Sequence, residues 1–205
     1  MGPLEDDRIM FKHHAVALVV FAGTFASCQL ANAQTNALPL PARQHPIAAE
    51  KNPPGDIPDN QAFVTFKSPL GFSIKVPEGW ARRDLPDHVA FSDKYNALEV
   101  RLQPLAAAPS LASLQAGDVA ALQRAPQAVR ITSLKPIALP VGQAFVLLYS
   151  ANSAPNPVTN KAIRLDNARY YLWKAGRLAT LTVSAPAGAD NADQWQLMAR
   201  SFAWQ

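Results

Sequence analysis

The sequence has little of the side-chain chemistry that most enzymes use. Its 205 residues include one cysteine, Cys28, and four histidines, of which only His45 and His88 follow residue 33. So few histidines and cysteines leave the folded part of the chain without a thiol nucleophile or a His-rich zinc cluster. The nearest approach to a serine-hydrolase elbow, residues 71–75, lacks its second glycine and lies in a predicted strand. We therefore expect no catalytic residue, no metal and no cofactor.

The sequence also lacks a hydrophobic run long enough to cross a bilayer. Its uncharged apolar run, residues 15–25 (AVALVVFAGTF), has eleven residues, whereas a transmembrane helix needs roughly 20. A run of this length is typical of a secretory signal peptide. Residues 10–14 (MFKHH) supply a positive flank directly before the run, so Met10 is a candidate for the true start. We predict that residues 1–33 are a signal peptide.

Two ways of ending this signal remain open. Residues 31–33 (Ala-Asn-Ala) fit the small-x-small cleavage pattern, which would start a soluble mature chain at Gln34. Residues 25–28 (FASC) resemble the lipobox of bacterial lipoproteins, whose cysteine, here Cys28, carries the lipid attachment. We favour cleavage after Ala33. Both alternatives predict export to the periplasm or beyond, and only a lipidated Cys28 would anchor the protein to a membrane.

Proline is abundant directly after the signal. Six prolines lie between Gln34 and Asn60, where large apolar residues are few. Such a segment neither continues a helix nor supplies a core. We predict a mostly disordered linker over residues 34–61 and a single domain over residues 62–205, which is long enough to bury one hydrophobic core.

The pattern of apolar residues in this domain predicts both strands and helices. Strands are expected at residues 62–67, 72–76, 89–91, 98–102, 129–132, 144–149, 161–174 and 178–185. Ser110 is the expected N-cap of a helix that reaches Arg124, and Asp190 or Asn191 caps a second helix near the C-terminus. The predicted fold class is α+β, with an antiparallel β-sheet and helices packed in a two-layer sandwich.

Three parts of the domain together resemble a known fold family. They are residues 71–80 (GFSIKVPEGW), the hairpin around residues 170–176, and Ser201-Phe202 after a tryptophan-bearing helix. This order is similar to the PsbP-like fold, shared by an extrinsic photosystem II subunit, a eukaryotic nuclear-import factor and bacterial envelope lipoproteins. The resemblance implies a non-catalytic accessory or binding protein, and it offers no catalytic residues to carry over.

Charge is unevenly distributed along the domain. Residues 62–118 hold six basic and six acidic side chains, whereas residues 119–189 hold eight basic side chains and one acid, Asp166. Such an excess attracts anions. We therefore predict an exported accessory or binding protein that engages an anionic partner: an acidic protein, an envelope polymer or a membrane surface. Export makes nucleic acid an unsuitable partner, and a basic protein without a specific partner is the simpler alternative.

One short strand interleaves aromatic side chains with cations. In residues 169–174 (RYYLWK), Tyr171 and Trp173 share a face with Arg169. A two-residue turn at residues 175–176 would expose that face, whereas a bulge at Gly176 would turn it into the core, and we favour the bulge. If exposed, the face is a binding stripe. The candidate binding residues are Arg164, Arg169, Tyr171, Trp173, Arg177 and Trp80, the last favoured as a plug at the edge of the core.

An envelope enzyme, such as a hydrolase with an unrecognised site, is the alternative function. Its general base could only be His88, because His45 lies in the predicted linker. A pocket that gathers carboxylates around His88 would favour this alternative. A basic surface without such a pocket would favour the binding protein.

Overall fold

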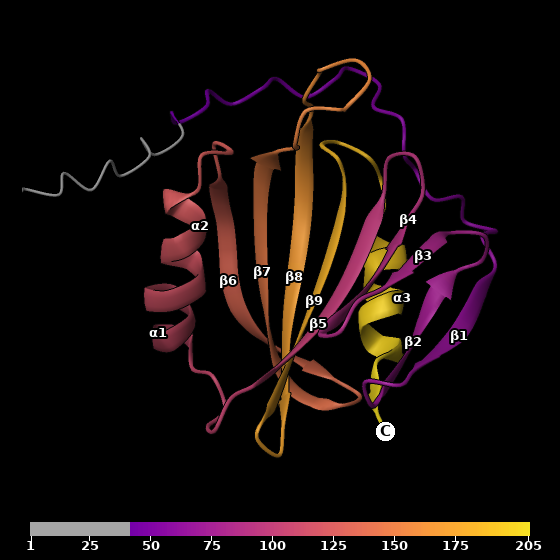
Figure 1. The fold of residues 1–205 in the computed structure, drawn as a ribbon, viewed down its shortest axis with the longest axis vertical. Helices are drawn as coiled ribbons and strands as arrows, with labels where there is room; N and C mark the ends of the chain where they lie inside the picture. Colours follow the sequence, from indigo (N-terminus) through magenta and orange to yellow (C-terminus); the bar gives the residue numbers. More distant parts are fainter. Residues whose placement is uncertain (1–41) are drawn as a thin grey trace, which may run out of the picture. The chain divides into compact units, whose positions relative to one another are not determined.

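A seven-stranded sheet is the largest element of residues 42–205, the part of the chain that the computed structural model describes (Figure 1). Every pair of neighbouring strands in it is antiparallel, as predicted. The predictions for the signal peptide, for Cys28 and for residues 34–41 lie outside the described residues. In spatial order the strands are β3 (Ala81–Asp84), β4 (His88–Ser92), β5 (Ala97–Pro104), β9 (Arg177–Pro186), β8 (Arg164–Lys174), β7 (Gly142–Asn152) and β6 (Arg130–Leu139).

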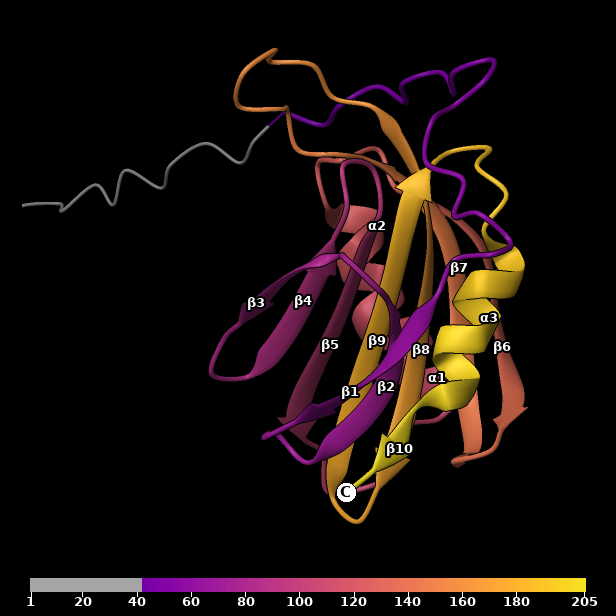
Figure 2. The same ribbon diagram turned by 90° about the vertical axis from the view of Figure 1, so that its right-hand side faces the viewer.

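A second, three-stranded sheet and a helix cover one face of the large sheet (Figure 2). Phe72 and Ile74 of the small sheet and Met198 of the helix are fully buried. They pack with alternate residues of the large sheet into the larger of two apolar cores. The elements are β1 (Phe63–Ser68), β2 (Phe72–Pro77), β10 (Ala203–Trp204) and α3 (Ala192–Ser201).

A helical segment covers the other face of the large sheet (Figure 1). Ser110 caps it, as predicted, because its hydroxyl accepts a hydrogen bond from the Ser113 backbone N–H. Leu114 and Val119 pack into a second, smaller core on this face. The antiparallel α+β class is confirmed, and this helix adds a layer to the two that the sequence predicts. Its parts are α1 (Leu111–Leu114), the π-helical turn η1 (Gln115–Val119) and α2 (Ala120–Arg124).

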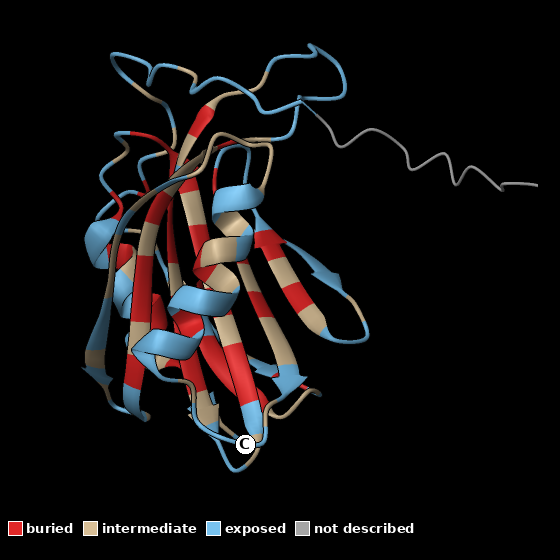
Figure 3. Ribbon diagram, turned by 90° about the vertical axis from the view of Figure 1, so that its left-hand side faces the viewer, coloured by how far each residue is buried: buried red, intermediate tan, exposed pale blue. Residues whose placement is uncertain are grey.

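Strand β8 shows how one sequence serves both faces. Tyr170 and Leu172 belong to the larger core, whereas Tyr171 and Trp173 lie in the smaller core under the helical segment. The alternation follows from the strand, whose successive side chains point to opposite faces. Figure 3 shows buried and half-buried positions along the central strands and exposed residues on the outer sides of the helices. A strand covered on both faces buries both sets of side chains.

The turn at residues 175–176 differs from the favoured prediction. Leu172 pairs with Ala179, which is the register of a two-residue turn, and no bulge shifts it. Ala175 and Gly176 both have positive φ, 47° and 80°, as a type I′ turn requires. The predicted bulge is therefore wrong. Tyr171 is nevertheless buried, because the helical segment covers the face that this register turns away from the larger core.

Residues 42–61 do not form the predicted disordered linker. Ile57 is 4% exposed and belongs to the larger core, and its N–H donates to Asn191 Oδ1 at 2.6 Å. The Ile47 N–H donates to Asn152 Oδ1 at 3.1 Å. Prolines keep this segment out of helices and strands, but side-chain amides of the domain satisfy its backbone instead. The boundary predicted at residue 62 is therefore wrong, and the ordered domain includes this segment.

Two strands lie outside the predictions because neither has a hydrophobic pattern. All four residues of β3 are exposed, and β10 has two residues that pair only with β2. Both strands form through pairing with a neighbour. None of the described helices is long and apolar enough to span a membrane.

Candidate functional site

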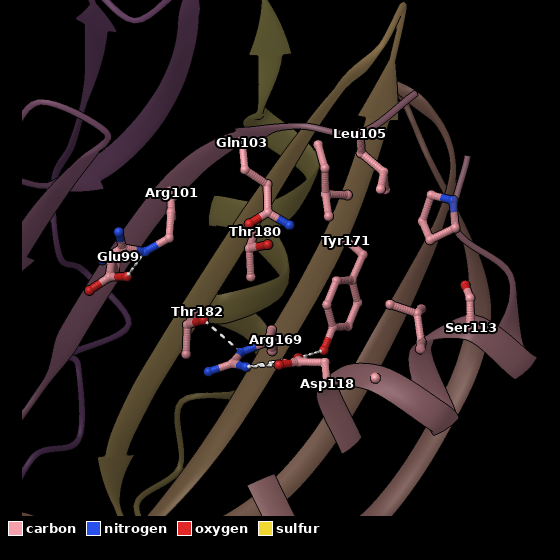
Figure 4. A pocket seen from close by; sticks show the side chains of 14 residues that line it. Glu99, Arg101, Gln103, Leu105, Ser113, Asp118, Arg169, Tyr171, Thr180 and Thr182 are labelled. Atoms are coloured by element: carbon pink, nitrogen blue, oxygen red, sulfur yellow. Dashed lines mark hydrogen bonds and ion pairs between the residues drawn. The ribbon is translucent and has the colours of Figure 1, made fainter. Parts of the chain in front are cut away.

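A cleft of about 420 Å³ opens between the helical segment and strands β5, β8 and β9 (Figure 4). The side chains of Gln103, Thr180 and Thr182 lie on its sheet side, and Asp118 projects from the helical turn η1. Two predicted residues, Arg169 and Tyr171, also line it. The cleft therefore brings together residues from three strands and one helix.

Asp118 is the centre of a polar network in this cleft. Arg169 Nη1 donates to both Asp118 carboxylate oxygens, at 3.0 and 2.8 Å, and the Tyr171 hydroxyl donates to one of them. Arg169 also donates from Nε to Thr182 Oγ1 at 3.2 Å and from Nη2 to the Tyr149 hydroxyl at 3.3 Å. This guanidinium is therefore engaged by the fold itself, and it is not a free cation for an anionic partner.

The π-helical turn explains how Asp118 reaches the sheet. A π turn is closed by hydrogen bonds between residues five apart and is wider than an α turn. Leu114 and Val119, which are five apart, both pack into the smaller core. Asp118, next to Val119, then points at Arg169. Gly117 directly precedes Asp118. A Cβ added to Gly117 would meet nothing within 4 Å, so this side of the turn is open to the cleft.

The tyrosine in this network is held in its protonated form. Burial raises the pKa of Tyr171, and the hydrogen bond to Asp118 raises this pKa further. The phenol therefore stays protonated at neutral pH and cannot serve as a base. No histidine or cysteine lies among the residues that line the cleft. Within residues 42–205, no group of three or more His, Cys, Asp or Glu side chains is placed to hold a metal ion.

His88 lies beside the cleft, on β4, and is not one of the residues that line it. Its Nδ1 is hydrogen bonded to Asp87 Oδ1 at 2.7 Å, and its Nε2 is 4.0 Å from Glu99 Oε2. Arg101 forms ion pairs with the same two carboxylates. The hydrogen bond from His88 lowers the pKa of Asp87. Carboxylates do gather around His88: one is hydrogen bonded to Nδ1, and the other faces Nε2 beyond hydrogen-bond distance.

Trp173 and Tyr171 do not form an exposed stripe. Tyr171 is 3% exposed. Trp173 is half-buried against the smaller core, and its Nε1 donates to the Leu105 carbonyl at 2.8 Å. The core alternative therefore holds for this face of β8, and both rings connect the sheet to the chain around the helical segment.

The other candidate residues have three different environments. Arg164 is buried, and its guanidinium donates to the Ala128 carbonyl and to Ser150 Oγ, at 2.8 and 2.6 Å. Burial lowers the pKa of Arg164. The Arg177 guanidinium lies 4.9 Å from the centre of the Trp204 ring. Trp80 is half-buried against the larger core, as a plug at its edge would be.

Exposed arginines flank residues 125–129, which join α2 to β6. Arg124 ends α2 and Arg130 begins β6, and both are exposed. Arg43, from the docked N-terminal segment, donates a hydrogen bond to the Gln123 carbonyl. None of these three arginines forms an ion pair with any residue from 42 to 205. We call Arg43, Arg124 and Arg130, with residues 123–130, the arginine turn.

Solved structures contain the same arrangement of strands and helices. Cyanobacterial PsbP from Synechocystis sp. PCC 6803 matches with a TM-score of 0.53 and 14% sequence identity, over 74% of this chain and 98% of that chain. The chain has a PsbP-like fold. The resemblance predicted from the sequence is thereby confirmed. No family model matches the chain, and no curated protein matches its sequence.

Two more distant structures are similar to the PsbP-like domain. The Ran-binding protein Mog1p of Saccharomyces cerevisiae has a TM-score of 0.48 and 12% identity, over 71% of this chain and 96% of that chain. Protein PA94 of Pseudomonas aeruginosa has a TM-score of 0.46 and 9% identity, over 70% and 97%. At these identities the similarity describes the fold alone.

Proposed function

We propose that this PsbP-like protein is an exported, non-enzymatic accessory protein of the bacterial cell envelope that binds an anionic partner through the arginine turn. The observation that carries the proposal is the convergence of Arg43, Arg124 and Arg130 on one short turn. They come from the N-terminal segment, a helix and a strand, and none is neutralised by a residue from 42 to 205. Several exposed cations on one short segment, with no acid paired to them, attract anions.

The ion pairs in the rest of the domain support the arginine turn as the binding surface. Asp118 is engaged by Arg169, and Asp87 and Glu99 are engaged by Arg101 and His88. The ion pairs of these three acids thus lie in or beside the cleft, away from the arginine turn. Of the predicted basic half, Arg164 and Arg169 are also used within the fold. The arginine turn keeps its positive charge for a partner.

The helix end gives the arginine turn a fixed geometry. The last carbonyls of a helix have no partner within the helix, and cations are favoured near them. Arg43 supplies a guanidinium to one of these carbonyls, that of Gln123. Arg124 is the next residue after Gln123, and Arg130 lies seven residues after Gln123, at the start of β6. Arg43 is therefore partly structural, whereas Arg124 and Arg130 are the side chains offered to a partner.

The enzyme alternative has less support in the arrangement of His88. A general base needs a ring nitrogen within reach of a substrate. Asp87 is hydrogen bonded to one nitrogen of His88, Glu99 faces the other, and the side chain is 12% exposed. We propose that this cluster stabilises the β4–β5 pair and that the protein acts by binding.

Charge reversal tests the binding surface. We expect Arg124→Glu/Arg130→Glu to lose binding to phosphatidylglycerol vesicles or to polyaspartate, measured by co-sedimentation at low salt. A basic residue near an anionic surface contributes about 1 kcal/mol, so reversing two should weaken binding at least roughly tenfold. The matched control, Lys67→Glu/Lys174→Glu, makes the same charge change at two other exposed positions and should weaken binding much less. Equal losses in the two variants, or no binding by the wild type, would reject the proposal.

Export is tested separately by the intact mass of the mature protein, with Cys28→Ser measured beside it. A chain that starts at Gln34 indicates a soluble exported form. A diacylated Cys28 that disappears in the variant indicates a lipoprotein. An unprocessed chain found in the cytoplasm would contradict the proposed location.

A further inference from the structure

A groove of about 370 Å³ lies on the other face of the sheet, between helix α3 and strands β6 and β7. Figure 2 shows α3 running beside these strands. Its floor is apolar and comes from the sheet, with Ile137 of β6 and Val146 and Leu148 of β7. Small-ligand pockets have volumes of roughly 300–1,000 Å³, so the groove has the size of a small-molecule site.

Tyr170 adds one polar group to this floor. It is 9% exposed and lines the groove, and its hydroxyl has no hydrogen-bond partner in the part of the chain that the structure describes. The two other buried tyrosines differ, because the hydroxyl of Tyr149 accepts from Arg169 and that of Tyr171 donates to Asp118. Burial raises the pKa of Tyr170, so the hydroxyl remains a donor. The hydroxyl is not among the buried unpartnered polar atoms of residues 42–205, so it is open to the groove, where a bound molecule can accept its hydrogen bond.

Cations border the groove. Lys135 of β6 and Arg200 of α3 line it, and neither forms an ion pair with another described residue. Asp193 is the one acid among its lining residues. An adjoining hollow of about 510 Å³ shares Asp193 and Arg200 and adds Lys75. The surroundings of the groove are therefore positive, with an apolar floor between the cations.

We propose that this groove binds a small amphipathic carboxylate, with its apolar body on Ile137, Val146 and Leu148 and its carboxylate accepting a hydrogen bond from the Tyr170 hydroxyl. Lys135 and Arg200 supply the opposite charge. A neutral apolar molecule would leave the hydroxyl and both cations unused. A peptide strand would need free backbone groups, and those of β7 are used by β6 and β8 on either side. The site shares no residue with the arginine turn, so it goes beyond the proposed function.

Decanoate is a suitable probe, and titration calorimetry of the purified protein measures its binding. We expect saturable binding of decanoate and at least roughly tenfold weaker binding of 1-decanol, which has the same chain without the charge. Tyr170→Phe removes only the hydroxyl and should weaken decanoate binding roughly tenfold, because a hydrogen bond to a charged group is lost. Lys135→Gln should weaken it severalfold.

Tyr149→Phe is the matched control, because it removes a tyrosine hydroxyl on the opposite face of the sheet. It should leave decanoate affinity unchanged, and so should Arg124→Glu/Arg130→Glu. Thermal unfolding of each variant verifies that it is folded. No saturable binding of decanoate, equal affinity in Tyr170→Phe, or loss in the Arg124→Glu/Arg130→Glu variant would overturn the proposal. Binding of an acidic amphipathic peptide in preference to decanoate would overturn it as well.

Discussion

The two faces of the seven-stranded sheet are stabilised in different ways. On one face, aromatic rings pack directly: Phe72 stacks on Phe202 with ring centres 5.6 Å apart. On the other face, charged and hydrogen-bonded groups connect the helical segment to the strands, with Asp118 bound to Arg169 and Tyr171. Apolar packing depends on area and shape, whereas a buried ion pair depends on both partners being present. The same strands thus participate in two different kinds of core.

The polar face is also the face with the cleft. Apolar side chains alone could close a helix onto a sheet, but charged groups there specify one placement of η1 over β8. The larger core has no comparable ion pair among the described residues. We infer that the aromatic face contributes most of the stability and that the polar face fixes the position of the helical segment.

The largest effect is expected from Phe72→Ala. Phe72 is completely buried and stacked on Phe202, and truncation of a buried phenylalanine costs about 3–5 kcal/mol. Urea unfolding measures the change. Leu122→Ala, at a half-buried position on the helical face, should cost about 1–2 kcal/mol. If the two substitutions lower the free energy of unfolding equally, the aromatic face does not contribute more stability than the helical face.

Removal of the carboxylate on the polar face should have the next largest effect. Asp118→Asn leaves Arg169 without its ion pair and should lower the free energy of unfolding by about 1–2 kcal/mol, since Asp118 is partly exposed to solvent. A double-mutant cycle with Arg169→Gln isolates the pair, and we expect a coupling of about 1 kcal/mol. Additive effects would mean that the two residues stabilise the fold independently.

High pH should weaken the fold through its buried tyrosines. Burial, with the hydrogen bond to Asp118, holds the pKa of Tyr171 above the unfolded value of about 10. Stability from this group is complete below about pH 10 and is lost as the pH rises through the folded pKa, by up to about 1.4 kcal/mol per pH unit. Urea unfolding between pH 9 and about 11 measures the slope. Tyr171→Phe should reduce this dependence of the unfolding free energy on pH, whereas a change at the exposed Tyr95 should leave it unaltered.

The smallest effect is expected from Trp173→Phe. This change removes the hydrogen bond from the indole N–H to the Leu105 carbonyl and should cost about 0.5–1.5 kcal/mol. Trp195→Phe, at a half-buried position against the larger core, controls for ring size, because no described residue accepts a hydrogen bond from its N–H. If the two substitutions cost the same, the hydrogen bond contributes nothing measurable to the helical face.

The elements that the sequence predicts are those with a local pattern of apolar residues, whether alternating or continuous. Strands β2, β5 and β9 and the cap at Ser110 follow from such local patterns. Strand β3 does not, because its four exposed residues have no apolar period. The two-residue turn at 175–176 is the alternative that the sequence does not favour, because alanine rarely adopts the positive φ that Ala175 has here. Local pattern therefore identifies elements that bury a face and misses those imposed by neighbours.

The candidate site could be predicted only in part. Arg169, Tyr171 and Trp173 share one face, as strand geometry requires. Asp118, the partner of Arg169 and Tyr171, lies 51 residues from Arg169 in the sequence. The π turn that aims Asp118 at the sheet has no sequence signature here beyond Gly117. The arginine turn depends on Arg43, which is 80 residues from its hydrogen-bond partner Gln123. Contacts between residues this far apart in the sequence form only in the tertiary fold, so local sequence patterns do not reveal them.

The docked N-terminal segment would also limit how far a lipid-anchored form of the protein can extend from its lipid. If Cys28 carries a lipid, residues 29–41 lie between the lipid and the first described residue, Ala42. Thirteen extended residues span roughly 45 Å at most, less than half of what a free linker to residue 61 would allow. The segment enters the domain at the arginine turn, where the Gln44 N–H donates to the Pro126 carbonyl. The chain before the described residues therefore joins the domain beside Arg43, at the surface that also carries Arg124 and Arg130.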